Sequence, residues 1–554
     1  MKGYNNCSAN SMTKTDRFAI RYIVVPVVLS IWMLFYQLGY PRFYDIRLEP
    51  RRAEIARNML EKGDWIVPQL SGEAKLTKPP LYFWAVALCS LKTGVNEFTA
   101  RIPSAACGVG TIIVTNLLGS LLINRTVGLI AALMLLVTNL FVTEARYAEM
   151  ESMLSFFITS AVYCFFKGYY AENQKIVWFS LLFASMGLGT MTKGPFAFTF
   201  PLIPIILYLF LYGEQKLLRG KSFLSGIIFF FIILLPWASV IVWRYPEFAY
   251  VVIRETVARF YTEGYGHGEP FYYYFGALGP ALFPWIFFLP ISLWVAFSSR
   301  LKDRRKELVF FILWIVANIV FLSFSNSKRD FYLTPIAPAA ALLSAATWEA
   351  LWEWFREKLP YDSVLLQRVF FITGAVLAAL AFTAGNPFVV NFPGRRFPDF
   401  PAFLLVTGSV FMLAALAKAL LPRVSIAKAV LAAIVVLVMA CQYLYLSYTV
   451  PQKNTSDSGA SFYKALPALV KPEAPLAFFW KYENYALSFY SRRPIIYLQT
   501  EDAVHSYMSA REKRYLVLAE KFLKNFPNMS WKTAFKSTYS EHASWGGYML
   551  VCNQ

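Results

Sequence analysis

Apolar runs close to 20 residues long recur along most of this chain, and they constrain its fold more than any other feature. A helix needs about 20 apolar residues to cross the hydrocarbon core of a bilayer. Thirteen runs approach that length and predict spanning helices at residues 22–39, 102–123, 127–145, 153–170, 176–191, 195–213, 223–243, 272–297, 308–325, 331–351, 369–385, 401–421 and 427–449. A further run at 81–91 is too short to span, so it predicts a re-entrant or interfacial helix.

The composition supports a membrane protein. Hydrophobic residues make up 57% of the 554 residues and charged residues 16%, against about 25% in a typical soluble chain. These values exclude a disordered chain and an ordinary cytosolic enzyme. The six cysteines are far apart with no CxxC pair, and the three histidines show no ligand spacing, so neither a disulfide framework nor a zinc site is predicted.

The basic residues between the apolar runs predict the orientation of the chain. With the N-terminus in the cytoplasm, the short cytoplasmic loops carry Arg125; Lys216, Arg219 and Lys221; Arg300, Lys302, Arg304, Arg305 and Lys306; Arg356, Lys358 and Arg368; and Arg423 and Lys428. This is the positive-inside pattern of polytopic membrane proteins. Thirteen spans then place residues 452–554 on the periplasmic side.

The tail differs in character from the rest of the chain. It is polar, and short β-like runs at 476–480, 494–498 and 515–518 alternate with helix-like stretches at 503–513 and 520–525. The predicted fold is therefore an all-α polytopic membrane domain over 1–451, with juxtamembrane helices in a periplasmic loop at 41–100. A small periplasmic α/β domain is predicted over 452–554.

One exterior loop, residues 41–79, is densely charged with both arginines and carboxylates. Its basic residues oppose the orientation bias, so their presence outside calls for a reason. The structural explanation is a solvated loop of amphipathic helices with paired charges. The functional explanation is a phosphorylated lipid substrate, because arginine matches phosphate oxygens in geometry and charge.

Four other exterior segments carry charges that topology alone would disfavour. They contain Glu144, Arg146, Glu149 and Glu151; Glu255 and Arg259; Lys328, Arg329 and Asp330; and Lys193. Snorkelling and local ion pairs are the structural alternatives. Because the segments come from distant parts of the chain, we expect them to converge on one cavity at the outer face. This cavity and the cytoplasmic loops account for most of the net charge of +20, so no nucleic-acid partner is predicted. A lipid transporter is disfavoured, because no internal repeat is visible and the charges gather at one face.

Several motifs in residues 40–340 together resemble one family of membrane enzymes. They are Glu49-Pro-Arg-Arg-Ala-Glu-Ile-Ala-Arg-Asn-Met, Gly63-Asp-Trp-Ile-Val-Pro, Lys78-Pro-Pro-Leu, Tyr147–Met153, Thr192-Lys-Gly, Leu235-Pro-Trp, Glu255…Arg259-Phe260, Pro270-Phe-Tyr-Tyr, Phe283-Pro-Trp and Ser327-Lys…Tyr332. They occur in the order found in the lipid A aminoarabinose transferases of glycosyltransferase family 83. The resemblance implies the GT-C fold and a kinship with the protein O-mannosyltransferases.

The resemblance also implies an activity and a set of site residues. The enzyme would move a sugar from a polyprenyl (undecaprenyl) phosphate donor to a lipid acceptor at the periplasmic face of the inner membrane. By position, Lys78, Arg259 and Tyr332 would bind the donor phosphate, Arg51 would also line the site, and Glu151 would stand for the second acidic residue of the family. The other charged residues expected at the cavity are Arg52, Glu149, Lys193, Lys328 and Arg329.

Two positions depart from the family pattern. Leu48 replaces the leading Asp of the motif Asp-Glu-x-Arg-Tyr, and Thr77 replaces the acidic residue before Lys78. The remaining candidate catalytic carboxylates are Glu49, Glu151 and Asp45. Pro50 is expected to hold Glu49 in an extended conformation.

The loss of the Asp favours one class of acceptor. A hydroxyl acceptor needs a base to take its proton, whereas a phosphate is already anionic. We therefore favour a phosphate of lipid A as the acceptor, with inversion at the anomeric carbon. A protein or cell-envelope glycan acceptor stays open, as does the choice between aminoarabinose and a uronic acid. A divalent metal shared by Glu49 and Glu151 also stays open; no other cofactor is expected, and the partners besides the substrates are membrane lipids around a monomer.

Overall fold

The computed structural model describes most of the chain. The described residues are 14–40, 42–43, 48–70, 73–254, 269–358, 368, 371–372, 375, 391–392, 395–396, 412, 415, 426–451, 460–480, 484–527, 529, 531–536 and 547–553. They divide into two compact units. The first comprises Met1–Ile286, Lys306–Leu342 and Val450–Gln554, and the second comprises Phe287–Arg305 and Leu343–Thr449.

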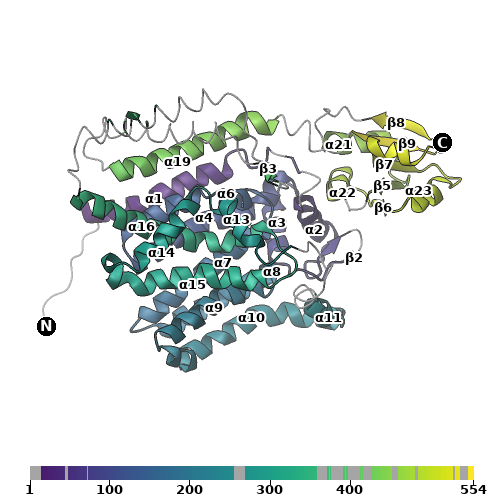
Figure 1. Cartoon of the computed structure of the whole chain (residues 1–554). Helices are drawn as coiled ribbons and strands as arrows, with labels where there is room; N and C mark the ends of the chain where they lie inside the picture. The colour runs from purple at the N-terminus through teal and green to yellow at the C-terminus, as the bar shows by residue number, and fades with distance from the viewer. Residues whose placement is uncertain are drawn as a thin grey trace, which may run out of the picture. The chain divides into compact units, whose positions relative to one another are not determined.

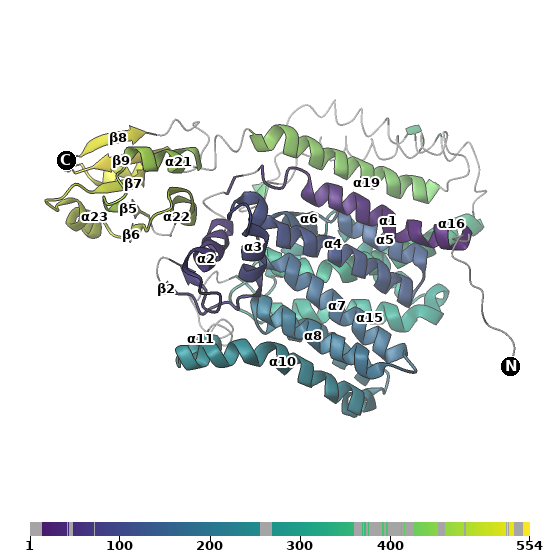
Figure 2. The same ribbon diagram turned by 180° about the vertical axis from the view of Figure 1, so that it is seen from behind.

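Helices dominate the described residues. In chain order they are α1 (Lys14–Phe35), α2 (Glu49–Lys62), α3 (Leu81–Ser90), α4 (Glu97–Leu122), α5 (Arg125–Leu136), α6 (Asn139–Arg146), α7 (Met150–Tyr170), α8 (Lys175–Lys193), α9 (Phe196–Leu211), η1 (Gln215–Arg219), α10 (Lys221–Arg244), α11 (Phe248–Ile253), α13 (Tyr273–Leu282), η3 (Trp285–Phe287), α14 (Phe288–Ala296), η4 (Ser299–Arg304), α15 (Arg305–Ser323), η5 (Asp330–Ile336), α16 (Ala337–Lys358), α19 (Ile426–Leu444) and the π-helical turn η6 (Tyr445–Thr449). In the first unit α4 packs against α5 and α7, and α8 packs against α7 and α10 (Figure 1, Figure 2).

The helices agree with the predicted all-α polytopic membrane domain. Within the described residues, six helices are long and apolar enough to cross a membrane, or eight if each of two bent helix pairs forms one span. The predicted span at 127–145 is bent by 65° between α5 and α6, and the one at 272–297 by 118° between α13 and Trp285–Ala296. The predicted spans at 369–385 and 401–421 lie largely outside the described residues.

Helix α2 is defined at both ends by its sequence. Pro50 occupies a first-turn position, where its missing N–H costs no hydrogen bond. Gly63 ends the helix at φ 72°, a left-handed conformation that glycine adopts without strain, and its N–H donates to the carbonyl of Met59 at 3.1 Å. The expectation that Pro50 holds Glu49 extended was wrong, because Glu49 is the first residue of α2.

The short apolar run at 81–91 forms α3, a ten-residue helix. It buries Tyr82, Phe83, Val86 and Ala87 against the protein and leaves Leu88 exposed. Before it lies a two-stranded antiparallel hairpin of β1 (Gln69–Leu70) and β2 (Glu73–Ala74). A helix of this length does not span a bilayer, in agreement with the interfacial or re-entrant helix predicted.

The C-terminal part of the chain forms a small α/β domain. Its helices and strands are α21 (Ala460–Leu469), β5 (Leu476–Phe479), α22 (Tyr485–Ser491), β6 (Ile496–Leu498), α23 (Glu501–Met508), β7 (Tyr515–Ala519), η7 (Glu520–Asn525), β8 (Lys532–Lys536) and β9 (Tyr548–Cys552). The sheet order is β6-β5-β7-β9-β8, with β5 parallel to β6 and β7 and with β9 antiparallel to β7 and β8. A separate hairpin pairs β3 (Asn391–Phe392) with β4 (Arg395–Arg396) in the second unit.

The three predicted strands are confirmed as β5, β6 and β7, whereas β8 and β9 were missed. The predicted domain boundary at 451/452 adjoins 452–459, which lie outside the described residues, and it stays a prediction.

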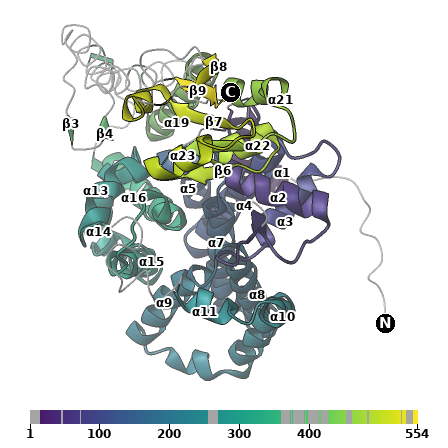
Figure 3. The same ribbon diagram turned by 90° about the vertical axis from the view of Figure 1, so that its right-hand side faces the viewer.

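The two faces of this sheet belong to different hydrophobic cores. Phe479, Leu518 and Val551 pack with α23 and η7 on one face. On the other face, Phe478 and Leu550 share a core with residues of α2 and α3, such as Ile55 and Tyr82. Figure 3 shows α22 beside α2. The sheet domain and the first loop are therefore built on one continuous apolar core.

Candidate active site

A polar cavity of about 260 Å³ lies in the first unit. Its lining residues are Leu48, Arg51, Arg52, Ile55, Lys75, Thr77, Lys78, Phe83, Met150, Glu151, Lys193, Ser327, Arg329, Phe331 and Tyr332. They come from α2 and its N-cap, the loop before α3, α3 itself, the start of α7, the end of α8 and the segment before and within η5. Four of the five charged exterior segments noted in the sequence thus contribute to one cavity.

The carboxylate of the cavity wall belongs to Glu151 and is already paired. Its Oε1 lies 2.5 Å from Nζ of Lys193, and both side chains are largely buried. The Lys193 ammonium also lies 4.4 Å from the centroid of the Tyr332 ring. Lys193 is thus held by a carboxylate and an aromatic face, and it neutralises the charge of Glu151.

Arg52 connects the cavity to the turn between α6 and α7. Its Nη2 lies 2.5 Å from Oε2 of Glu149, and its Nη1 donates to the carbonyl of Ala148 at 3.3 Å. Burial, opposed by Arg52 and assisted by Glu151, raises the pKa of Glu149 to about 7. Burial alone would lower the pKa of Arg52, but Glu149 and Glu151 together hold it above its ordinary value.

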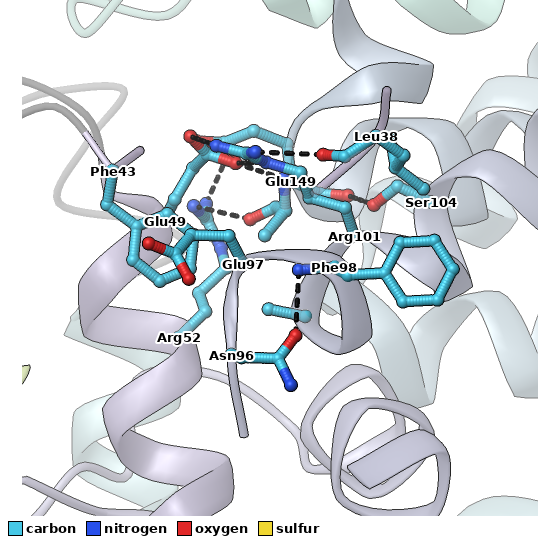
Figure 4. A network of polar contacts seen from close by, with 12 residues as sticks. Leu38, Phe43, Glu49, Arg52, Asn96, Glu97, Phe98, Arg101, Ser104 and Glu149 are labelled. Carbon is cyan, nitrogen blue, oxygen red and sulfur yellow. Dashed lines mark hydrogen bonds and ion pairs between the residues drawn. The ribbon is translucent and has the colours of Figure 1, made fainter. Parts of the chain in front are cut away.

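Glu49 is a buried ion-pair residue rather than part of the cavity wall (Figure 4). Its Oε1 accepts from Nε of Arg101 at 2.8 Å and its Oε2 from Nη2 at 3.0 Å. The N–H of Ala148 also donates to Oε1, at 2.7 Å, and Arg101 Nη1 donates to the carbonyl of Leu38 at 3.0 Å. Glu49 therefore joins α2 to α4 and to the turn that carries Glu149.

Three buried carboxylates come together at the break between α6 and α7. One oxygen each of Glu144, Glu149 and Glu151 lies within 4.8 Å of the others, although the chain is not helical between Arg146 and Met150. Arg52 and Lys193 already balance two of these charges. Glu49 is not among the three, and both its oxygens are occupied. These carboxylates thus fit ion pairing better than they fit a divalent metal.

Most of the predicted site residues meet at the cavity. Its wall contains Arg51, Arg52, Lys78, Glu151, Lys193, Arg329 and Tyr332. Glu149 lies behind Arg52, and Lys328 is buried with its Nζ donating to the carbonyl of Glu269 at 2.8 Å. Arg259 and Asp45 lie outside the described residues, so their predicted roles stay predictions.

Sequence reasoning missed three residues that shape the site. Arg101 was placed just before an apolar run and given no role, yet it is buried at the centre of the Glu49 network. Lys75 was counted only as a loop charge, and it lines the cavity. Tyr485, from the C-terminal domain, lies with its ring centroid 5.5 Å from Cζ of Arg51. An arginine at the membrane end of an apolar helix was the signal available for Arg101.

Comparison with known proteins shows related sequences and a shared fold. The family described as dolichyl-phosphate-mannose-protein mannosyltransferase matches residues 47–252. An uncharacterized protein of Aquifex aeolicus is 31% identical over 388 residues, covering 69% of this chain and 72% of that protein.

An undecaprenyl phosphate-alpha-4-amino-4-deoxy-L-arabinose arabinosyl transferase of Yersinia enterocolitica is 32% identical over 328 residues. The match covers 57% of this chain and 58% of the length of that transferase. The crystal structure of ArnT from Cupriavidus metallidurans bound to undecaprenyl phosphate aligns with a TM-score of 0.74 at 19% identity, over 97% of this chain and 98% of that chain. The last comparison shows a shared fold along nearly the whole chain.

Proposed function

Because the chain belongs to the ArnT-like family of GT-C membrane glycosyltransferases, we propose that it transfers a sugar from a polyprenyl phosphate to a phosphate group of lipid A. The donor would be undecaprenyl phosphate carrying the sugar. The positive-inside pattern supports a cavity at the periplasmic face of the inner membrane, with the C-terminal domain on the same side.

The charge of the cavity wall carries this proposal. Six cationic side chains, Arg51, Arg52, Lys75, Lys78, Lys193 and Arg329, line it together with one carboxylate, that of Glu151. Three of them pair with carboxylates, Arg52 with Glu149, Lys193 with Glu151 and Lys75 with Glu73, and positive charge is still in excess. The excess suits two phosphate groups, one on the donor and one on the acceptor, brought close enough to react.

The ion pairing of Glu151 with Lys193 also favours a phosphate acceptor. Among the described residues, Glu151 is the one carboxylate of the wall, and it is neutralised by Lys193 at 2.5 Å. A carboxylate in such a pair is a weak base, because taking up a proton would leave the Lys193 charge unbalanced. A phosphate acceptor needs no base, whereas a hydroxyl acceptor does.

The reaction then follows from the placement of the cations. An acceptor phosphate oxygen attacks the anomeric carbon, and the bond from that carbon to the polyprenyl phosphate oxygen breaks. The electron pair leaves with the polyprenyl phosphate, and direct attack inverts the anomeric centre. Lys78, Tyr332 and Arg51 would hold the leaving phosphate and stabilise its growing charge. Arg259, which lies outside the described residues, is proposed to assist them.

Mass spectrometry of lipid A from cells with and without the protein tests the proposal. We expect lipid A from the complete strain to carry a sugar on phosphate that disappears on deletion and returns with the wild-type gene. A Lys78→Met gene should not restore it, whereas Lys471→Met, at an exposed lysine of the C-terminal domain, should. Unchanged lipid A would refute the lipid A acceptor and direct the search to a protein or an envelope glycan.

A further inference from the structure

Helix α22 of the C-terminal domain is fixed firmly at its start. Asn484 caps it, with Oδ1 accepting from the N–H of Leu487 at 3.0 Å. The Asn484 side chain also donates from Nδ2 to the hydroxyl of Tyr463 at 2.5 Å. Residues Ala486 to Ser491 are buried, and Tyr485 alone in the helix is half-buried. The position of the Tyr485 ring is therefore set by a rigid element.

Two other aromatic residues of α22 attach the helix to the first loop. Arg57 of α2 donates from Nη1 to the carbonyl of Phe489 at 2.7 Å, and its Cζ lies 4.9 Å from the Phe489 ring centroid. The Tyr490 hydroxyl donates to Oε1 of Glu97 at 2.7 Å and accepts from the N–H of Phe43 at 3.0 Å. None of these residues lines the cavity, so they fix the spacing of α2 and α22 without contacting a substrate.

Tyr485 is the aromatic residue of α22 that reaches a cavity side chain. Its ring centroid lies 5.5 Å from Cζ of Arg51, which lines the cavity, whereas Tyr485 itself does not. A guanidinium over an aromatic face is attracted to it, and its N–H edge remains able to donate to an anion. An unrestrained arginine side chain loses much rotamer freedom when it binds a ligand. A side chain that an aromatic ring already holds in place loses less.

We propose that Tyr485 is a positioning residue for substrate binding, which holds Arg51 in the orientation that receives a substrate phosphate. The C-terminal domain thereby contributes to the affinity of the cavity without touching the substrate. This inference rests on the proposed function, because it assumes that Arg51 binds a phosphate group.

The test compares Tyr485→Leu and Tyr485→Phe with wild-type protein in lipid nanodiscs. The probe is undecaprenyl phosphate, whose Kd is measured directly, and the KM of the sugar-loaded donor is measured in a transfer assay. A cation–π contact at a partly exposed site corresponds to about a two- to fivefold change in an equilibrium constant. We expect Tyr485→Leu to raise Kd and KM by this factor with kcat nearly unchanged, and Tyr485→Phe to match wild type.

A double-mutant cycle separates positioning from a general structural role. If Tyr485 acts through Arg51, Tyr485→Leu has no further effect on Kd in the Arg51→Gln background. Phe522→Leu is the matched control, because Phe522 is a half-buried aromatic residue on the opposite face of the same sheet. It should leave Kd unchanged. Tyr485→Met, which keeps most of the side-chain volume without a ring, repeats the test should the leucine variant fold poorly.

The outcomes distinguish this inference from the proposed function. Wild-type protein that fails to bind undecaprenyl phosphate would overturn the proposed function. Wild-type protein that binds it, with a Tyr485→Leu variant of equal Kd, would overturn only the role of Tyr485. Equal effects of Tyr485→Leu with and without Arg51 would also overturn it.

Discussion

Glu49 and Arg101 form a bidentate ion pair that is almost completely buried, with side-chain exposures of 0% and 1%. The pair joins the first residue of α2 to the first turns of α4. Removing one member of a buried pair leaves an uncompensated charge and costs about 3–5 kcal/mol. We expect Arg101→Met to lower the free energy of unfolding by about this amount, measured by thermal unfolding in detergent.

A double variant checks the origin of that cost. Replacement of both side chains by apolar residues, Glu49→Leu with Arg101→Met, should recover a large part of the lost stability, because no buried charge is left unpaired. A double variant as unstable as the sum of the single variants would contradict the ion-pair explanation.

Lys78 is expected to contribute to donor binding through its charge. A hydrogen bond to a charged group contributes about 1.5–3 kcal/mol, so Lys78→Met should raise the donor KM roughly 10- to 100-fold. The measurement is initial rate against donor concentration in nanodiscs. Lys78→Arg, which keeps the charge, should lose much less, and equal losses in the two variants would argue against a phosphate contact.

Glu151 tests the nature of the acceptor. With a phosphate acceptor the carboxylate orients groups and does not act as a base, so Glu151→Gln should lower kcat by less than about tenfold. General base catalysis contributes about 10²–10⁴-fold, and a loss of that size would point instead to a hydroxyl acceptor. The assay is single-turnover transfer with a saturating donor.

The raised pKa of Glu149 predicts that the affinity for the donor depends on pH. Its pKa is raised to about 7, chiefly by burial, so its carboxyl is neutral below that pH and charged above it. Below pH 7 the neutral carboxyl frees the Arg52 guanidinium from its ion pair, and the donor phosphate is bound more tightly. We expect the donor KM to fall between pH 8 and pH 6, and Glu149→Gln to remove this change.

The raised pKa of Glu149 also determines how the stability of the protein changes with pH. Because the pKa in the folded protein lies above the ordinary value of 4.5, the contribution of Glu149 to stability is present below pH 4.5 and is lost as the pH rises through about 7. A Glu149→Gln variant should therefore lose less stability between pH 6 and pH 8 than wild type. An opposite trend in thermal unfolding would contradict the raised pKa.

We expect the exposed end of helix α3 to contact lipid. Cys89 and Leu88 are exposed at its end, and an interfacial helix would immerse them in the bilayer. A fluorophore on Cys89, with the other cysteines changed to serine, should be quenched by brominated lipids. A probe at an Asp502→Cys site, exposed in the C-terminal domain, should not be quenched.

The sequence predicted the parts of the fold that depend on local pattern. Apolar length gave the helices, and alternation with polar turns gave β5, β6 and β7. It missed β8, which is exposed along its whole length and lacks an apolar pattern. It also missed β9, although that strand is a short apolar run buried at every position. The bends in the predicted spans 127–145 and 272–297 were also invisible, since apolar length carries no information about helix direction.

The sequence predicted which residues form the site better than it predicted how those residues pair with one another. The exterior charges identified Lys193 as a candidate, and the family resemblance implied Arg51, Lys78 and Tyr332. The structure brings all four together. Sequence could not show that Glu49 faces Arg101 rather than the cavity, because the pairing depends on how α2 packs on α4. For the same reason Tyr485, more than 400 positions from Arg51, could not be connected with it.

The shared core of the sheet domain and α2 has a consequence for biosynthesis. Strand β9 pairs with both β7 and β8, and it is made after every other strand of that sheet. Until β9 has emerged, the apolar face that packs against α2 is incomplete, and the helix that carries Arg51 and Arg52 lacks part of its support. We therefore expect a chain that ends before residues 548–552 to insert its helices but to leave α2, which carries both arginines, without part of its apolar support.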